Sequence, residues 1–245
     1  MSVSEIAISI DEVDVTVCVL GEIAIEFDGI AVPLPASLRA VALIGWLATH
    51  PGPRRRSEIA SSLWPDVPDI NARKNVRNAL WCLRQALGHH VDSLLDTSGT
   101  RIGLRNVSVD LRRFEDHVTA GRLDDALALA SGELLAGVDD EWARVARDAH
   151  RHRLIALLAD RSDEAAAVGD FRSATASAYR AAELNPLSES CARLLMRRYE
   201  EAGDRSVALA VYARIVDRLR RELQIGPSEE TCRLAQKIRM RHAAV

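Results

Sequence analysis

The C-terminal half of the sequence repeats itself with a period of 34 residues. GDFRSATASAYRAAELNP starts at Gly169, GDRSVALAVYARIVDRL starts at Gly203, and a less regular copy, GRLDDA, starts at Gly121. A period of this length, with Gly at the turn and small residues at the helix crossings, is typical of tetratricopeptide-like helical hairpins. Strand patterns end near residue 110, so the repeat predicts an all-α tetratricopeptide-like helical repeat domain at residues 111–245.

The N-terminal part has a different periodicity. Apolar and polar residues alternate between residues 13 and 34, which is typical of β-strands. Asp28-Gly29 indicates a tight turn, because glycine tolerates the positive φ that such turns require. From Ser37 onward the apolar residues follow helical spacing. We therefore expect an α+β domain at residues 15–110, preceded by an acidic extension at residues 1–14 that forms either a disordered tail or an extra strand.

The segment NARKNVRNALWCLRQALG, residues 71–88, predicts an amphipathic helix. At about 100° per residue, one face collects Val76, Leu80, Leu83 and Leu87 as the core stripe. Asp69 or Asn71 is the expected N-cap, and Gly88 is the expected end. The opposite side of the helix has no acidic residue, and it carries Asn71, Arg73, Lys74, Arg77, Asn78, Trp81, Arg84 and Gln85.

The charge distribution favours a polyanionic partner for this helix. The whole chain has a net charge of −3, yet Lys and Arg outnumber Asp and Glu within residues 31–110. Residues 1–30, in contrast, contain acidic residues and no Lys or Arg. The basic excess is therefore a local electrostatic footprint and not a property of the whole chain.

The order of elements around this helix predicts a winged helix-turn-helix domain. A short helix, SEIASSLW, has Ser57 as its expected N-cap and stops at Pro65; the long helix follows, and then a hairpin in LLDTSGTRIGL, residues 94–104. In such domains the long helix enters the DNA major groove and the hairpin lies along the backbone. Arg, Lys, Asn and Gln reach base edges or phosphates there. The predicted DNA-binding residues are Arg54, Arg55, Arg56, Asn71, Arg73, Lys74, Arg77, Asn78, Trp81, Arg84, Arg101 and Arg105.

Two alternatives remain open at this point. The Trp81 indole contacts a thymine methyl group or a sugar, or else it covers an edge of the core or a domain interface. The helical repeat also allows a different function for the whole protein. It would then be an adaptor that binds a protein partner and carries a degenerate DNA-binding module.

Five segments resemble the Streptomyces antibiotic regulatory protein family, which pairs an OmpR-type winged helix with a bacterial transcriptional activator domain. They are LGEIAIEFDGIAVPLP, SEIASSLWPDVPDINARKNVRNALWCLRQALG, VDLRRFEDHV, GELLAGVDDEW and LRRELQIGPSEET. The resemblance extends from about residue 15 to about residue 238. It implies the small form of the family, without an appended ATPase or phosphopeptide-binding module.

The resemblance also implies targets and partners. It implies activation of a pathway gene cluster, often in secondary metabolism, by binding to promoter direct repeats and recruiting RNA polymerase. Direct repeats about one helical turn apart would seat a homodimer on one face of the DNA. The loop implied to face polymerase is formed by Pro65, Asp66, Val67, Pro68, Asp69 and Ile70.

Motifs for catalysis, cofactors and metals are absent from the sequence. It has no G-x-G-x-x-G, phosphate-loop or H-E-x-x-H motif, so we expect no catalytic residue, no metal site and no cofactor. His89-His90 and the pair His150 and His152 lack partners at ligand spacing and are expected on the surface. No apolar run reaches the roughly 18–20 residues of a membrane span, and no signal-peptide pattern occurs. We therefore expect a cytoplasmic protein that is not an enzyme.

Overall fold

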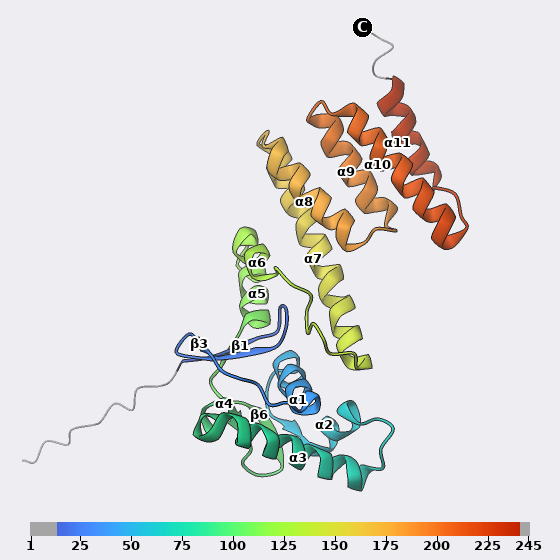
Figure 1. Ribbon diagram of the computed structural model, residues 1–245. Helices are drawn as coiled ribbons and strands as arrows, with labels where there is room; N and C mark the ends of the chain where they lie inside the picture. Colours follow the sequence, from blue (N-terminus) through green and yellow to red (C-terminus); the bar gives the residue numbers. More distant parts are fainter. Residues whose placement is uncertain (1–13, 241–245) are drawn as a thin grey trace, which may run out of the picture. The chain divides into compact units, whose positions relative to one another are not determined.

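The computed structural model describes residues 14–240 and divides into two compact units, with the boundary between Asp148 and Ala149 (Figure 1). Most described residues are helical, and every strand among them belongs to the first unit. The expected acidic extension, apart from Asp14, lies outside the described residues. The predicted domain boundary near residue 110 falls within the first unit and stays a prediction.

The first sheet contains β1 (Val15–Cys18), β2 (Ala24–Phe27), β3 (Ile30–Ala31) and β7 (Ser108–Val109), in the order β3-β2-β1-β7. The predicted turn between β2 and β3 is confirmed, since Asp28 and Gly29 have φ values of 51° and 76°. β7 pairs parallel with β1, and the sequence does not predict it. Two residues are too few to show a period, so only the pairing with a distant strand reveals β7.

A buried carboxylate fastens this sheet to the helix that follows it. Asp110, the first residue of α5 (Asp110–Thr119), accepts the backbone N–H groups of Val19 at 2.9 Å and Leu20 at 2.8 Å. It also accepts the N–H of Leu111 at 2.7 Å. Burial raises the pKa of the Asp110 carboxyl above its usual value, against the lowering effect of these donors. One side chain thus joins two segments that are 91 residues apart in sequence.

Helices α1 (Leu38–Thr49), α2 (Arg56–Leu63) and α3 (Asp69–Leu87) form the helical core of the first unit. The predicted core stripe of α3 is confirmed, because Val76, Leu80, Leu83 and Leu87 are all buried. The predicted end of α3 is confirmed as well. Gly88 is its C-cap and has a φ of 57°, which an L-residue with a side chain adopts only at a cost.

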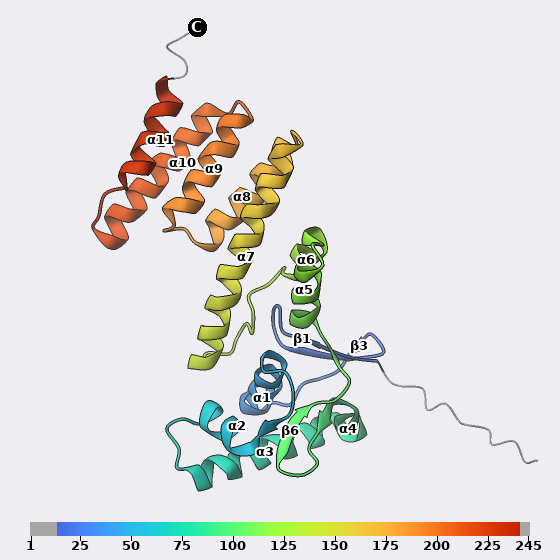
Figure 2. The ribbon, with the colours of Figure 1, turned by 180° about the vertical axis from the view of Figure 1, so that it is seen from behind.

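The second sheet contains β4 (Arg54–Arg55), β5 (Leu95–Asp96) and β6 (Arg101–Leu104), in the order β4-β6-β5. The predicted hairpin is confirmed by the antiparallel pairing of β5 with β6, in which Leu95 lies opposite Leu104. A 3₁₀ turn (Gly88–His90) and α4 (Val91–Leu94) connect α3 to this hairpin, and Figure 2 shows β6 and α4 beside α3. The sequence does not predict β4, which pairs with β6 through Arg54 and Ile102.

The predicted N-caps of the two helices are wrong. α2 begins at Arg56, one residue before Ser57, and its N-cap Arg55 makes no side-chain cap bond. The pairing of β4 with β6 fixes the chain up to Arg55, so the helix starts directly after the strand. α3 starts after Pro68, again without a side-chain cap, and Asp69 and Asn71 therefore lie inside its first turn.

The remaining helices follow the predicted repeat. The first unit contains α6 (Leu123–Leu129); α7 (Glu141–Ala167) spans the boundary; α8 (Phe171–Leu184), α9 (Glu189–Glu201), α10 (Arg205–Arg218), the π-helical η2 (Leu219–Leu223) and α11 (Glu229–Met240) belong to the second unit. Gly121, Gly169 and Gly203 each have a positive φ between two helices, as predicted. At each turn the glycine N–H donates to the carbonyl three residues earlier, at 3.0 to 3.1 Å. The three turns thus share one helix-ending motif.

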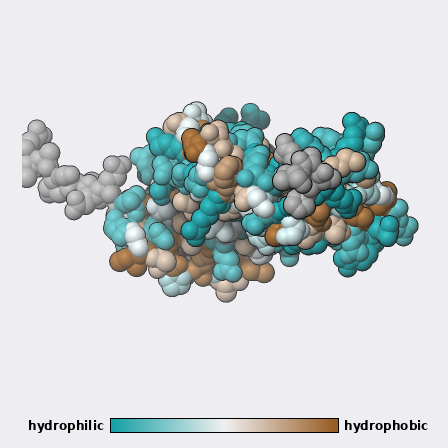
Figure 3. All heavy atoms as spheres, turned by 90° about the horizontal axis from the view of Figure 1, so that it is seen from above, coloured by the Kyte–Doolittle hydropathy of each residue, from teal (hydrophilic) through white to brown (hydrophobic). Residues whose placement is uncertain are grey.

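Polar residues dominate what is visible of the surface. Hydrophilic residues cover most of the face seen in Figure 3, and hydrophobic residues form smaller groups between them. Among residues 14–240, no helix is both long enough and apolar enough to pass through a membrane.

The expectation that His150 lies on the surface is wrong. His150 is only 8% exposed, because on α7 it shares a face with the buried residues Leu154 and Leu157, four and seven residues later. His152, two residues further on, points the other way and is exposed. Burial lowers the pKa of the His150 imidazole below its ordinary value.

The second unit is therefore expected to lose stability when the pH falls below about 6.5, the pKa of histidine in an unfolded chain. Below this pH the unfolded state binds a proton that the folded state resists, so the free energy of unfolding decreases with decreasing pH. Thermal unfolding followed by circular dichroism across this range measures the effect. His150→Gln should flatten the dependence of the unfolding temperature on pH. His152→Gln, the matched exposed control, should leave that dependence unchanged. Equal slopes in His150→Gln and wild-type protein would refute the assignment.

Candidate functional site

Helix α3, the start of α2 and the tip of the β5–β6 hairpin line a groove of about 1030 Å³. Five arginines and one tryptophan are among its lining residues, and none of the lining residues is acidic. The lining residues are Arg55, Arg56, Ser57, Arg73, Arg77, Leu80, Trp81, Arg84, Gly99 and Thr100. We call this surface the α3 groove.

The residues that α3 contributes to the groove lie on one side of the helix because of their spacing. Arg73, Arg77 and Trp81 follow at intervals of four residues, and Arg84 follows Arg77 by seven, so all four lie on one side. The buried stripe from Val76 to Leu87 holds the opposite side of α3 against the core. Trp81 is 61% exposed, which excludes a role as a buried plug of the core.

Three hydrogen bonds hold the hairpin loop against α2 and α3. Arg56 Nη2 donates to the Thr97 carbonyl oxygen at 3.2 Å, and Arg84 Nη2 donates to the Thr97 hydroxyl at 3.0 Å. Arg56 also donates its backbone N–H to the Thr100 carbonyl at 3.4 Å. These bonds fix the hairpin beside α3, and they commit the side chains of Arg56 and Arg84 to the fold.

The other predicted cationic residues differ in whether their side chains form hydrogen bonds or ion pairs within the protein. Arg73 pairs with Asp69 at 2.7 Å, with both side chains more than half exposed. Arg54 is partly buried and bonds to Glu58 at 3.2 Å and to the Pro51 carbonyl at 3.1 Å. By contrast, the side chains of Arg55, Lys74 and Arg77 have no hydrogen-bond or ion-pair partner within residues 14–240.

The two hairpin arginines lie outside the groove lining and are exposed. Arg101 donates to the Pro53 carbonyl at 3.3 Å, and Arg105 lies 3.8 Å from the Asp96 carboxylate. Both contacts involve exposed groups and are weak. These side chains are therefore available to a ligand that lies along the hairpin.

The structure brings together six of the twelve residues that the sequence predicts to bind DNA: Arg55, Arg56, Arg73, Arg77, Trp81 and Arg84. Asn71, Lys74 and Asn78 are exposed on α3 but do not line the groove. The sequence analysis missed Ser57, Leu80, Gly99 and Thr100. The hairpin pattern in residues 94–104 places Gly99 and Thr100 at its tip, and this signal could have identified them.

The loop expected to face polymerase is largely exposed. Pro65, Asp66 and Pro68 are exposed, and Val67 is partly buried. Asp69 and Ile70 belong to the first turn of α3, where the Ile70 side chain is 83% exposed.

The described residues contain no cluster of three or more His, Cys, Asp or Glu side chains suited to a metal ion. The α3 groove offers cations, hydrogen-bond donors and one indole. Such groups bind anions and stack on or contact planar bases.

Comparisons with known proteins point to gene regulation. The bacterial transcriptional activator domain family matches residues 105–239. The regulatory protein AfsR of Streptomyces coelicolor is 28% identical over 243 residues, which cover 90% of this chain and 24% of AfsR. AfsR of Streptomyces griseus is 27% identical over 196 residues, covering 74% of this chain and 20% of that protein. The chain thus spans about a quarter or less of the length of these relatives.

One solved structure has a similar fold. The structure titled Mycobacterium tuberculosis EmbR in complex with low affinity phosphopeptide aligns with a TM-score of 0.74 and 21% sequence identity. The alignment covers 94% of this chain and 66% of EmbR. None of these descriptions names an enzyme. Because the family match extends over more than half of the sequence, this chain belongs to the bacterial transcriptional activator domain family.

Proposed function

We propose that this protein is a sequence-specific DNA-binding transcriptional activator whose α1–α3 helices and β5–β6 hairpin act as a winged helix. The observation that carries the proposal is the α3 groove, in which arginines from two helices surround an exposed indole without any acidic residue. A polyanion is the ligand that such a surface favours, because each neutralised phosphate releases counterions from the DNA.

The partners of the arginines suggest a division of roles. Arg77 lies in the middle of α3 and has no side-chain partner among the described residues, so its guanidinium can donate two parallel hydrogen bonds to a guanine in the major groove. Trp81, one turn further along, can contact a neighbouring thymine methyl group. Arg101 in the hairpin and Arg55, which lies opposite it on β4, are suited to phosphates. Arg56 and Arg84 orient the hairpin through Thr97.

Activation requires a contact beyond DNA. We infer that the exposed loop Pro65–Ile70 meets RNA polymerase, and that two copies of the protein bind promoter direct repeats as a homodimer. The targets would be genes of one pathway, as in a secondary-metabolism cluster, and the protein would act in the cytoplasm. These inferences rest on the family resemblance and on the exposure of the loop.

Gel-shift assays of the full chain on the DNA upstream of its own gene test the proposal. We expect a discrete complex at low salt that survives an excess of unrelated duplex, with an affinity that falls steeply as salt increases. Failure to bind any upstream DNA at low salt would overturn the proposal. Binding that unrelated duplex removes equally well would reduce it to non-specific DNA binding.

A further inference from the structure

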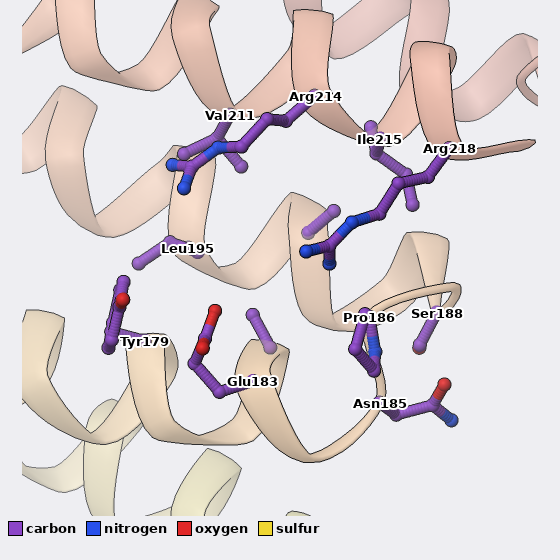
Figure 4. Close-up of a pocket in the computed structure, with 12 residues that line it drawn as sticks. Tyr179, Glu183, Asn185, Pro186, Ser188, Leu195, Val211, Arg214, Ile215 and Arg218 are labelled. Atoms are coloured by element: carbon purple, nitrogen blue, oxygen red, sulfur yellow. The ribbon is translucent and has the colours of Figure 1, made fainter.

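A second concave surface lies within the helical unit, between α8, α9 and α10. Its floor is apolar, with Leu195 of α9 and Val211 and Ile215 of α10 all buried. Tyr179 and Glu183 of α8 stand on one side (Figure 4). The guanidinium groups of Arg214 and Arg218 extend from α10 towards them. We call this surface the α8–α10 groove.

The two arginines have no counter-charge of their own. Neither Arg214 nor Arg218 has a hydrogen-bond or ion-pair partner within the described residues. They are four residues apart on one helix, a spacing at which like charges repel and destabilise the helix. Their neighbour Arg221, in contrast, is paired with Asp217 at 2.5 Å. An anion between Arg214 and Arg218 would relieve this repulsion.

The groove keeps a positive excess even when its own carboxylate is counted. Glu183 is the only acidic residue in the lining, so it can neutralise at most one of the two guanidinium groups. The hydroxyl of Tyr179, a residue that is 44% exposed, offers a further hydrogen-bond donor on the same side as Glu183. The electrostatics therefore favour a ligand that brings at least one negative charge.

The size of the groove restricts what can enter it. Its volume is about 40 Å³, far below the roughly 300–1,000 Å³ of sites for drug-sized ligands. It therefore admits one side chain and excludes a cofactor. Inorganic phosphate would fit between the guanidinium groups but would make no contact with the apolar floor. A peptide that carries both an apolar and an acidic side chain satisfies both parts of the surface.

We propose that the α8–α10 groove docks an acidic peptide segment of a protein partner. One apolar side chain of the partner lies on the floor formed by Leu195, Val211 and Ile215. Two carboxylates of the partner, one helical turn apart on either side of that residue, pair with Arg214 and Arg218. The spacing matches because the two arginines are themselves one turn apart. This interaction involves the helical unit and does not depend on the DNA-binding function proposed above.

Fluorescence anisotropy of the full chain with a labelled peptide tests this docking. The peptide places Leu between two Glu residues one helical turn apart. Arg214→Gln and Arg218→Gln should each weaken binding about three- to tenfold, as expected for partly exposed charge-assisted pairs. Glu183→Gln should strengthen binding, because it removes the one carboxylate that repels the peptide. Arg197→Gln is the matched control, since Arg197 is exposed on α9 and does not line the groove.

Several results would overturn the proposal. They are the absence of saturable binding, an equal loss of affinity in Arg197→Gln, and weaker binding in Glu183→Gln. Undiminished binding of a peptide with Ser in place of Leu would show that the floor has no role. Displacement of the peptide by inorganic phosphate at equal concentration would show that the groove binds simple anions instead. Each variant should have the same circular dichroism spectrum as wild type, so that a loss of binding cannot be attributed to a loss of folding.

Discussion

Replacing Asp110 with alanine is expected to lower the free energy of unfolding of the first unit by about 3–5 kcal/mol. The wild-type carboxylate accepts three backbone N–H groups, those of Val19, Leu20 and Leu111. Two of these donors belong to Val19 and Leu20, which directly follow β1 and are buried, so water cannot easily replace the lost acceptor. A buried N–H without a partner costs about 1–3 kcal/mol, and the substitution leaves more than one of them unsatisfied.

Urea unfolding followed by tryptophan fluorescence measures this effect selectively. The four tryptophans, Trp46, Trp64, Trp81 and Trp142, all lie before the boundary at Asp148, so their emission reports on the first unit. The free energy of unfolding of Asp110→Asn should lie between those of wild type and Asp110→Ala. The amide oxygen of asparagine still accepts a hydrogen bond, whereas its NH₂ group cannot. Asp116→Ala, an exposed position on the same helix, should change the free energy by less than about 0.5 kcal/mol. A change that small in Asp110→Ala would mean that the carboxylate does not join β1 to α5.

Asp110 also illustrates which parts of the fold the sequence can predict. The stripe of α3, the Asp28-Gly29 turn and the glycines between repeat helices are set by neighbours within a few residues, and the sequence predicts all of them. β4 and β7 are two-residue strands that exist because distant strands pair with them. A local pattern cannot reveal them, and the same is true of a carboxylate whose donors are 91 residues away.

The candidate site likewise has a part that the sequence predicts and a part that only the structure shows. Helical spacing identifies the side of α3 that remains exposed, and Arg73, Arg77, Trp81 and Arg84 do lie together in the groove. The sequence could not show that Arg84 is bonded to Thr97 while Arg77 is unpaired. That difference depends on where the hairpin loop lies. The structure therefore distinguishes between arginines that are equivalent in the sequence pattern.

The second large effect is expected at Arg77. Arg77→Ala should weaken binding to the specific operator about 5- to 150-fold, because a bidentate arginine–guanine contact contributes about 1–3 kcal/mol of discrimination. The same variant should relax the preference at one base position in a selection from randomised duplexes. Its stability should match wild type, since the exposed Arg77 side chain has no partner within the described residues. Arg77→Lys should restore phosphate attraction but not the base preference, because lysine cannot form the two parallel bonds.

Arg101→Ala separates base recognition from general attraction to DNA. Arg101 is exposed on the hairpin, and within residues 14–240 its side chain donates only to the Pro53 carbonyl. A phosphate contact at this position predicts uniform weakening across all sequences and a salt slope reduced by about one. If Arg101→Ala narrows or shifts the preferred sequence while Arg77→Ala weakens every duplex equally, the roles are reversed and the hairpin reads the bases. If neither substitution alters binding, the DNA lies elsewhere on the molecule. Only a base-specific loss at Arg77 together with a uniform loss at Arg101 supports recognition by α3 with the hairpin on the backbone.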